Sequence, residues 1–266
     1  MPGEARQQLK KWARHKLESL GDFLENHAAG LKSRTYYIDL FSHDAAAGVT
    51  PAVFETETRF TGYIFAARDG GQAREIRRLT AAHRGETTVI SGCLVHDSVV
   101  RRLFDGIPRS ASSFALIDPP GYRRLRWSLI KKLATHGVDW RGHKTDLLII
   151  FPLEMALTRN LTRPECAASI TRLFGGSDWL EIKKSLVEGN ANLDVIRHQL
   201  VSLYKKGLKS LGYRYVSDAS PAPFSRPPVY HVIWASDHQN RARLLADVWG
   251  RPRYLAGELF AGEKAE

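Results

Sequence analysis

A short apolar run that ends in an acid and two prolines fixes the middle of the fold. Residues 114–122 read Phe-Ala-Leu-Ile-Asp-Pro-Pro-Gly-Tyr. The four apolar residues are too few for a helix, and Pro119 and Pro120 stop a helix from continuing through them. The run is therefore predicted to be a buried strand with Asp118 at its carboxyl end. In an open parallel sheet, ligands bind beyond the carboxyl ends of the strands, which makes Asp118 a candidate for chemistry.

Segments of alternating type on both sides of this strand predict an α/β fold. Further strands are expected at residues 35–41, 62–67, 87–90, 146–151, 213–216 and 229–235, where β-branched and aromatic residues dominate. Helices are expected at residues 4–29, 98–104, 125–133 and 200–211, around the arginines of residues 74–78, and from the capping box of Ser236 and Gln239 through Val248. Strands and helices alternate until two adjacent strands close the pattern. This order predicts a Rossmann-like, mostly parallel sheet whose last strand runs antiparallel.

One elaborated domain is expected from a length of 266 residues, with an insertion late in the chain. The expected organisation is an N-terminal helix in residues 1–34, the first part of the core in 35–151, a helical insertion or cap in 152–210, completion of the core in 211–250, and a tail in 251–266. The insertion is inferred because about 60 residues of mostly helical pattern separate two strand signals.

The charge balance favours a polyanionic partner. Lys and Arg number 39 against 28 Asp and Glu, which leaves a net charge of +11. Basic residues also gather directly after Tyr122, at Arg123, Arg124, Arg126, Lys131 and Lys132. Lys and Arg that contact phosphates supply most of the sequence-independent affinity for nucleic acid. Nucleic acid is therefore the expected partner, with a merely solvated basic helix face as the alternative.

Several classes of protein find no support in the sequence. Cys93 and Cys166 are far apart and belong to no Cys-x-x-Cys pair, so reduced, structural thiols are expected. The His43-Asp44 and His96-Asp97 pairs match no standard metal signature, and no metal is predicted. No apolar run is long enough to span a membrane and the start lacks the apolar core of a secretion signal, so a soluble cytoplasmic protein is expected.

The loop after Asp118 is similar to the active-site loop of class I methyltransferases that modify amino nitrogens of nucleic-acid bases. This resemblance implies that Asp118 accepts a hydrogen bond from the target amine, that Pro119 and Pro120 stiffen the loop, and that Tyr122 stacks on the base. Gly121 is a departure, since those enzymes place the aromatic residue directly after the prolines.

Over most of residues 5–249 the chain resembles the three-Cys-motif partner proteins, a bacterial family. The matching segments include Tyr37-Ile-Asp-Leu-Phe41, Gly48-Val-Thr-Pro51, the Asp118 loop followed by Trp127, Asp146-Leu-Leu-Ile-Ile-Phe-Pro152, and Val229-Tyr-His-Val-Ile-Trp-Ala-Ser236. The resemblance implies a fold that binds S-adenosylmethionine, with Asp39, Phe41, Gly48 and Asp69 near that cofactor. It also implies a phage-associated partner that carries a radical-SAM-like three-cysteine motif, whereas the family's own reaction is not established.

Three departures from the family pattern concern the cofactor. In the family, the first strand runs into a Gly-x-Gly turn that lets the backbone approach the cofactor. This chain has Ser42, His43, Asp44 and Ala45 there, and side chains with a Cβ crowd that approach. The ribose-binding acid after the second strand aligns with Ala67, and the acid that holds the adenine amine aligns with Cys93. Two functions stay open: a methyltransferase acting on an amino group of nucleic acid, and a non-catalytic subunit that binds nucleic acid or the radical-SAM-like partner.

Overall fold

The computed structural model describes residues 16–27, 34–42, 53, 60–81, 85–219, 231–238 and 244–249. The predicted helix at residues 4–29 is described from 16 to 27, where it is helical throughout. Gly48, most of the turn after the first strand, and the tail from residue 251 lie outside the described residues.

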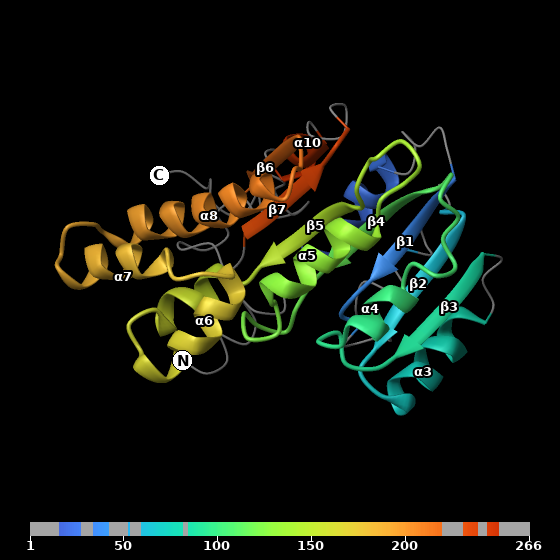
Figure 1. Ribbon diagram of the computed structural model, residues 1–266, viewed down its shortest axis with the longest axis horizontal. Helices are drawn as coiled ribbons and strands as arrows, with labels where there is room; N and C mark the ends of the chain where they lie inside the picture. The colour runs from blue at the N-terminus through green and yellow to red at the C-terminus, as the bar shows by residue number, and fades with distance from the viewer. Residues whose placement is uncertain are drawn as a thin grey trace, which may run out of the picture.

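Seven strands form one sheet in the order β3-β2-β1-β4-β5-β7-β6 (Figure 1). Their bounds are β1 Thr35–Asp39, β2 Gly62–Ala67, β3 Glu86–Ser91, β4 Ser112–Ile117, β5 Asp146–Phe151, β6 Tyr215–Ala219 and β7 His231–Ser236. The first five strands pair in parallel, and β7 runs antiparallel to both β5 and β6. The predicted fold class, a Rossmann-like class I methyltransferase sheet with an antiparallel last strand, is confirmed.

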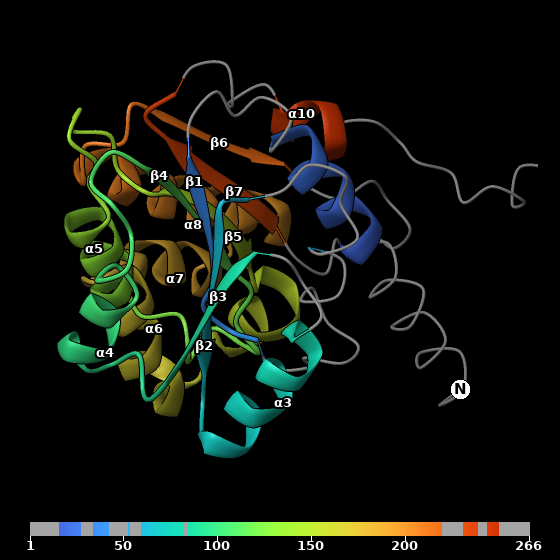
Figure 2. The same ribbon diagram turned by 90° about the vertical axis from the view of Figure 1, so that its right-hand side faces the viewer.

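Helices cover both faces of the sheet, as the turned view in Figure 2 shows. They are α3 Gly70–Thr80, α4 Asp97–Arg102, α5 Trp127–His136, α6 Ala167–Phe174, α7 Trp179–Val187, α8 Leu193–Ser210 and α10 Leu244–Trp249, with a π-helix at Leu153–Thr158 and a 3₁₀ turn at Pro164–Cys166. The helix at residues 16–27, α3 and α10 lie on one face, and α4 to α8 lie on the other.

Strand alternation explains the two layers. Successive side chains of a strand point to opposite faces, so Phe114 and Leu116 of β4 enter one hydrophobic cluster while Ala115 and Ile117 enter the other. All four of these side chains are fully buried. A strand buried on both faces reads as a continuous apolar run, which is the pattern that predicted β4.

The longest helix begins earlier than its apolar spacing predicted. α8 starts at Leu193, where the expected helix began at residue 200. The side chain of Asn192 caps it, because Asn192 Oδ1 accepts a hydrogen bond from Val195 N at 3.0 Å. Leu193 and Val195 are exposed, but Ile196 is fully buried, so the apolar face of α8 begins one turn before Leu200.

The helices between β5 and β6 are packed on Trp127, the first residue of α5. Gly175 has φ +73°, and a Cβ placed there would lie 2.1 Å from Trp127 Cδ1. A Cβ on Gly207 of α8 would lie 2.7 Å from Trp127 Cη2, and the ring of Tyr204 meets the Trp127 ring edge-on at 5.3 Å between centroids. Two glycines of the insertion therefore let the backbone approach both sides of one indole ring.

Candidate functional site

A cavity of about 240 Å³ lies at the carboxyl edge of the sheet. The segments that follow β1, β2, β3 and β4 all contribute to its wall, together with the start of α5. Its apolar part is formed by Leu40, Phe41, Ala66, Ala67, Leu94 and Leu129. This is the edge at which open α/β sheets bind their ligands, so the cavity is the leading candidate for the functional site.

The residues aligned with the cofactor contacts lie in this wall. Phe41 lines the cavity, and so do Ala67 at the end of β2 and Cys93 after β3. Gln72 connects the segments that follow β1 and β2. Its Oε1 accepts a hydrogen bond from Arg68 N at 2.7 Å, and its Nε2 donates to the carbonyl of Ser42. The ends of β1 and β2 are thereby joined by one side chain.

Asp39 and Asp69, the two acids expected near the cofactor, both serve the local backbone. Asp39 is buried, and its Oδ1 accepts a hydrogen bond from Phe41 N at 3.0 Å. Asp69 is the N-cap of α3, since its Oδ1 accepts from Gln72 N at 2.9 Å while its Oδ2 lies 2.9 Å from Arg68 Nε. The hydrogen bond from Gln72 N and the contact with Arg68 lower the pKa of Asp69. Asp69 itself is not among the residues that line the cavity.

Asp118 lies at the end of β4 as predicted, and the helix at residues 16–27 reaches it. Lys16 Nζ lies 2.6 Å from Asp118 Oδ2, and both side chains are largely buried. Pro119 is buried and Pro120 is exposed, and Pro120 lines the cavity. The carboxylate thus already holds an ammonium group at hydrogen-bond distance.

Tyr122 is packed inside the protein. Only 3% of its surface is exposed, and it belongs to the cluster that contains Leu125 and Trp127. Burial raises the pKa of the Tyr122 hydroxyl. In this arrangement its ring face is not presented to solvent, so stacking on a base stays a prediction that requires the loop to move.

The five basic residues predicted to bind nucleic acid have different surroundings. Arg124 and Arg126 line the cavity. Arg123 Nη2 donates to Cys166 Sγ at 3.6 Å, and Lys132 Nζ lies 3.6 Å from Asp97 Oδ1 and donates to the carbonyl of Val95 at 3.1 Å. The side chain of Lys131 is exposed.

Arg68 is a third guanidinium at the cavity, and sequence analysis did not single it out. The signal was present, because Asp69 and Gln72 have the spacing of a capping box. That spacing assigns Asp69 to the start of a helix and leaves the preceding residue, Arg68, at the end of the strand.

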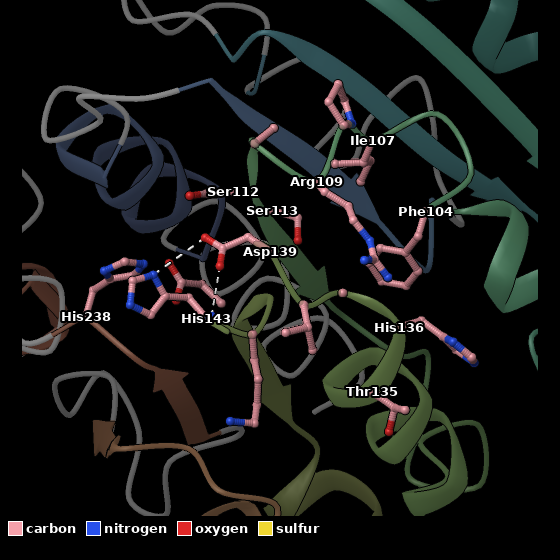
Figure 3. Close-up of a pocket in the computed structure, with 16 residues that line it drawn as sticks. Phe104, Ile107, Arg109, Ser112, Ser113, Thr135, His136, Asp139, His143 and His238 are labelled. Carbon is pink, nitrogen blue, oxygen red and sulfur yellow. Dashed lines mark hydrogen bonds and ion pairs between the residues drawn. The ribbon is translucent and has the colours of Figure 1, made fainter. Parts of the chain in front are cut away.

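A second, smaller cavity of about 180 Å³ lies at the opposite edge, where β4 and β5 begin (Figure 3). His143 and His238 lie side by side at one end of it, with ring centroids 4.5 Å apart, and Asp139 lies next to them. Asp139 Oδ1 accepts hydrogen bonds from Arg141 N at 2.8 Å and His143 N at 2.9 Å, so this carboxylate orders its own loop. Within the described part of the chain, no three His, Cys, Asp or Glu side chains converge as a metal site would require.

No protein-family model matches the chain, and no curated protein matches it. Solved structures do resemble it. A SAM-dependent methyltransferase of Leishmania major has 10% identity and a TM-score of 0.45 over 84% of this chain and 72% of its own. The CMeT domain of the citrinin polyketide synthase has 12% identity and a TM-score of 0.44, and Aeropyrum pernix fibrillarin with bound S-adenosyl-L-methionine has 12% and 0.41; each covers 76% of this chain. The chain spans 46% of the former and 66% of the latter.

At such identities and TM-scores these likenesses carry no argument about activity. The strand order and the cavity at the carboxyl edge define the class: this is a protein of the class I methyltransferase fold. The likeness to the three-Cys-motif partner proteins receives no support from any match. None of the helices in the described residues is long and apolar enough to cross a lipid bilayer.

The described wall fits S-adenosylmethionine poorly. That cofactor carries a sulfonium, an ammonium and one carboxylate, which leave a net positive charge, and its ribose hydroxyls and adenine amine need hydrogen-bond acceptors. The cavity has Ala67 and Cys93 at the two places where the sequence resemblance expects acids, and no Asp or Glu is found among the described residues that line it. Three arginines line it instead, and their charge repels a cationic ligand.

Proposed function

We propose that this methyltransferase-fold protein is a nucleic-acid-binding subunit that contacts phosphates along the carboxyl edge of its sheet. The observation that carries the proposal is the state of Arg124 and Arg126. Both line the cavity, and neither forms an ion pair with any acid that the structure describes. Their guanidinium groups are therefore free to receive phosphate oxygens, which they match in geometry.

Two further features support this function. The chain carries a net charge of +11, which raises the local concentration of a polyanion and its rate of association. Lys131 is exposed on α5, the helix that begins immediately after Arg126. A strand of nucleic acid that lies over the cavity has a further cation available beside it.

The test compares two charge-matched double variants in binding to a fluorescein-labelled DNA duplex and a labelled single-stranded RNA. Arg124→Gln with Lys131→Gln is expected to weaken binding at least about tenfold and to reduce the log–log salt slope by about two units, because each phosphate contact releases condensed counterion. The control, Lys206→Gln with Lys209→Gln, removes two exposed cations from α8, which packs against β6 at the far end of the sheet. Equal losses in both pairs would mean that the positive charge acts diffusely, and would overturn the proposal.

A second candidate is methyl transfer to an amino group of nucleic acid, and the position of Asp118 favours it. Asp118 directly follows β4, in the loop whose Pro120 lines the cavity, and in this role Lys16, with Nζ 2.6 Å from Asp118 Oδ2, would be displaced by the substrate amine. Transfer of a labelled methyl group from S-adenosylmethionine to nucleic acid, abolished in Asp118→Ala while nucleic-acid affinity is retained, would establish it. A radical-SAM-like partner with a three-cysteine motif remains a proposal that rests on the sequence resemblance alone.

A further inference from the structure

The cavity at the carboxyl edge has two chemically different parts. Leu40, Phe41 and Leu129 belong to its apolar wall, while Arg68, Arg124 and Arg126 bring positive charge to it. An apolar wall with a few directed polar groups is the usual composition of a small-molecule site. A ligand that satisfies both parts carries a flat or apolar body and an anionic end.

The three arginines differ in how far their charge is already balanced. Arg68 Nε lies 2.9 Å from Asp69 Oδ2, but this pair is open to solvent and contributes little. Arg124 and Arg126 form no ion pair with an acid in the described ranges. Like charges that line one small cavity repel each other, and an anion between them removes that repulsion. Planar guanidinium groups bind carboxylate or phosphate by two parallel hydrogen bonds, and the proposed contact with nucleic acid selects phosphate.

We propose that this cavity binds a nucleoside monophosphate unit, with the base against the apolar wall and the phosphate at Arg124 and Arg126. The inference rests on the proposed function and names the ligand of the same edge. A free nucleotide and the 5′-terminal nucleotide of a strand carry this chemistry alike.

Ala67 and Cys93 also suit an anionic ligand. An acid at the place of Ala67 or Cys93 would hold a ribose or an adenine amine, but its charge would also repel a phosphate in so small a cavity. Ala67 and Cys93 remove that repulsion while the arginines supply attraction. Uncharged Ala67 and Cys93 together with Arg68, Arg124 and Arg126 give the cavity a wall that favours an anion over a cation.

The experiment is calorimetric titration of the full chain with 5′-AMP, adenosine and S-adenosylmethionine. The expected order of affinity is 5′-AMP above adenosine and above S-adenosylmethionine. Arg126→Gln should weaken 5′-AMP by about tenfold or more, as expected for loss of a charge-assisted hydrogen bond. Cys93→Asp gives both ligands an acceptor for the adenine amine but adds a negative charge near the phosphate, so the ratio of the 5′-AMP affinity to the S-adenosylmethionine affinity should fall by about tenfold or more. Misfolding would weaken both ligands alike.

Ser91→Asp is the matched control for Cys93→Asp. Ser91 is exposed at the end of β3, two positions before Cys93, and it is not among the residues that line the cavity. The same charge there should leave the affinity for 5′-AMP within about twofold of wild type, because Ser91 lies outside the cavity wall and solvent screens its charge from the ligand. Equal effects of the two substitutions, or tighter binding of S-adenosylmethionine than of 5′-AMP by the unaltered protein, would overturn the inference.

Two oligonucleotides of one sequence, with a 5′-phosphate or a 5′-hydroxyl, separate the two sources of the ligand. If the 5′-phosphate oligonucleotide binds more tightly and 5′-AMP competes this preference away, the cavity holds the terminus of a strand. If the two oligonucleotides bind with equal affinity while 5′-AMP still binds, the cavity holds a free nucleotide. Salt-dependent nucleic-acid binding without any binding of 5′-AMP would refute the cavity inference and leave the proposed function standing. Binding of 5′-AMP without nucleic-acid binding would do the reverse.

Discussion

Lys16 Nζ lies 2.6 Å from Asp118 Oδ2, and the two residues come from the first described helix and the end of the central strand β4. The pair ties the helix at residues 16–27 to the loop that carries Pro119 and Pro120. It also occupies the carboxylate oxygen that the resemblance to amino methyltransferases assigns to a substrate amine. Access to Asp118 therefore requires Lys16 to leave.

Removal of the Lys16 ammonium is predicted to destabilise the protein because it leaves the buried Asp118 carboxylate without its ion-pair partner. In Lys16→Met the free energy of unfolding should fall by about 1–3 kcal/mol, the cost of leaving a buried polar group unsatisfied. At this chain length each kcal/mol lowers the melting temperature by about 2–4 °C. The double variant Lys16→Met with Asp118→Asn should recover part of the loss in a calorimetric scan. Strictly additive losses would show that the two groups do not interact.

A methyl group at Gly207 is predicted to destabilise the packing of α8 on Trp127. An added Cβ would lie 2.7 Å from Trp127 Cη2, so Gly207→Ala should cost about 1–3 kcal/mol despite the better helix propensity of Ala. Trp127→Phe removes the clashing atoms, and Gly207→Ala should cost less in that background. Gly176→Ala is the control, because nothing lies within 4 Å of a Cβ there. Urea unfolding curves of the four variants measure these differences.

Asp218 is predicted to contribute stability that disappears in acid. Its Oδ2 lies 2.9 Å from His231 Nε2, and its Oδ1 contacts Lys205 Nζ. The hydrogen bond from His231 and the charge of Lys205 lower the pKa of Asp218 well below its usual range, against the opposing effect of burial. Because the folded pKa is depressed, the contribution is complete above the unfolded value of about 4 and is lost as the pH falls towards the folded value.

The corresponding measurement is urea unfolding of wild type and Asp218→Asn at several pH values. At pH 7 the variant should be less stable by about 1–3 kcal/mol, and the difference should narrow steadily below about pH 4. A difference that stayed constant from pH 7 to pH 3 would mean that the charge of Asp218 is not responsible.

The two thiols are predicted to react at very different rates. Cys93 is exposed at the cavity and Cys166 is buried, so a maleimide reagent should label Cys93 first. Bound 5′-AMP should slow this labelling, which mass spectrometry of the labelled peptides measures. Protection of Cys93 by S-adenosylmethionine and not by 5′-AMP would contradict the anionic pocket.

Much of the fold was predictable because local signals agree with it. The apolar run that ends at Asp118 predicted the central strand, and the alternation of strand and helix signals followed by two adjacent late strands predicted the parallel sheet with its antiparallel last strand. Lys16 could not be assigned to Asp118, since 102 positions separate them and a lysine on an amphipathic helix reads as solvated. The burial of Tyr122 also depends on packing between distant helices, which no local pattern encodes.

The smaller cavity with His143 and His238 was not predicted either, because its residues also come from distant parts of the chain. His143 and His238 come from a loop before β5 and from the end of β7, nearly a hundred positions apart. Neither residue stands in a recognisable motif, and both lie at the edge where the parallel strands begin. Open parallel sheets bind their ligands at the carboxyl ends of their strands, so a site was expected at the other edge.

The close packing of the backbone at Gly175 and Gly207 against the Trp127 ring affects ligand binding. Arg124 and Arg126 lie on the short segment between β4 and Trp127, so both ends of that segment are anchored before any ligand arrives. A segment held in this way loses little further backbone freedom when it binds, and ordering a side chain is then the main entropic cost. The arginines are thus preorganised, and a substitution at Gly207, remote from the cavity, is expected to weaken phosphate binding by loosening that segment.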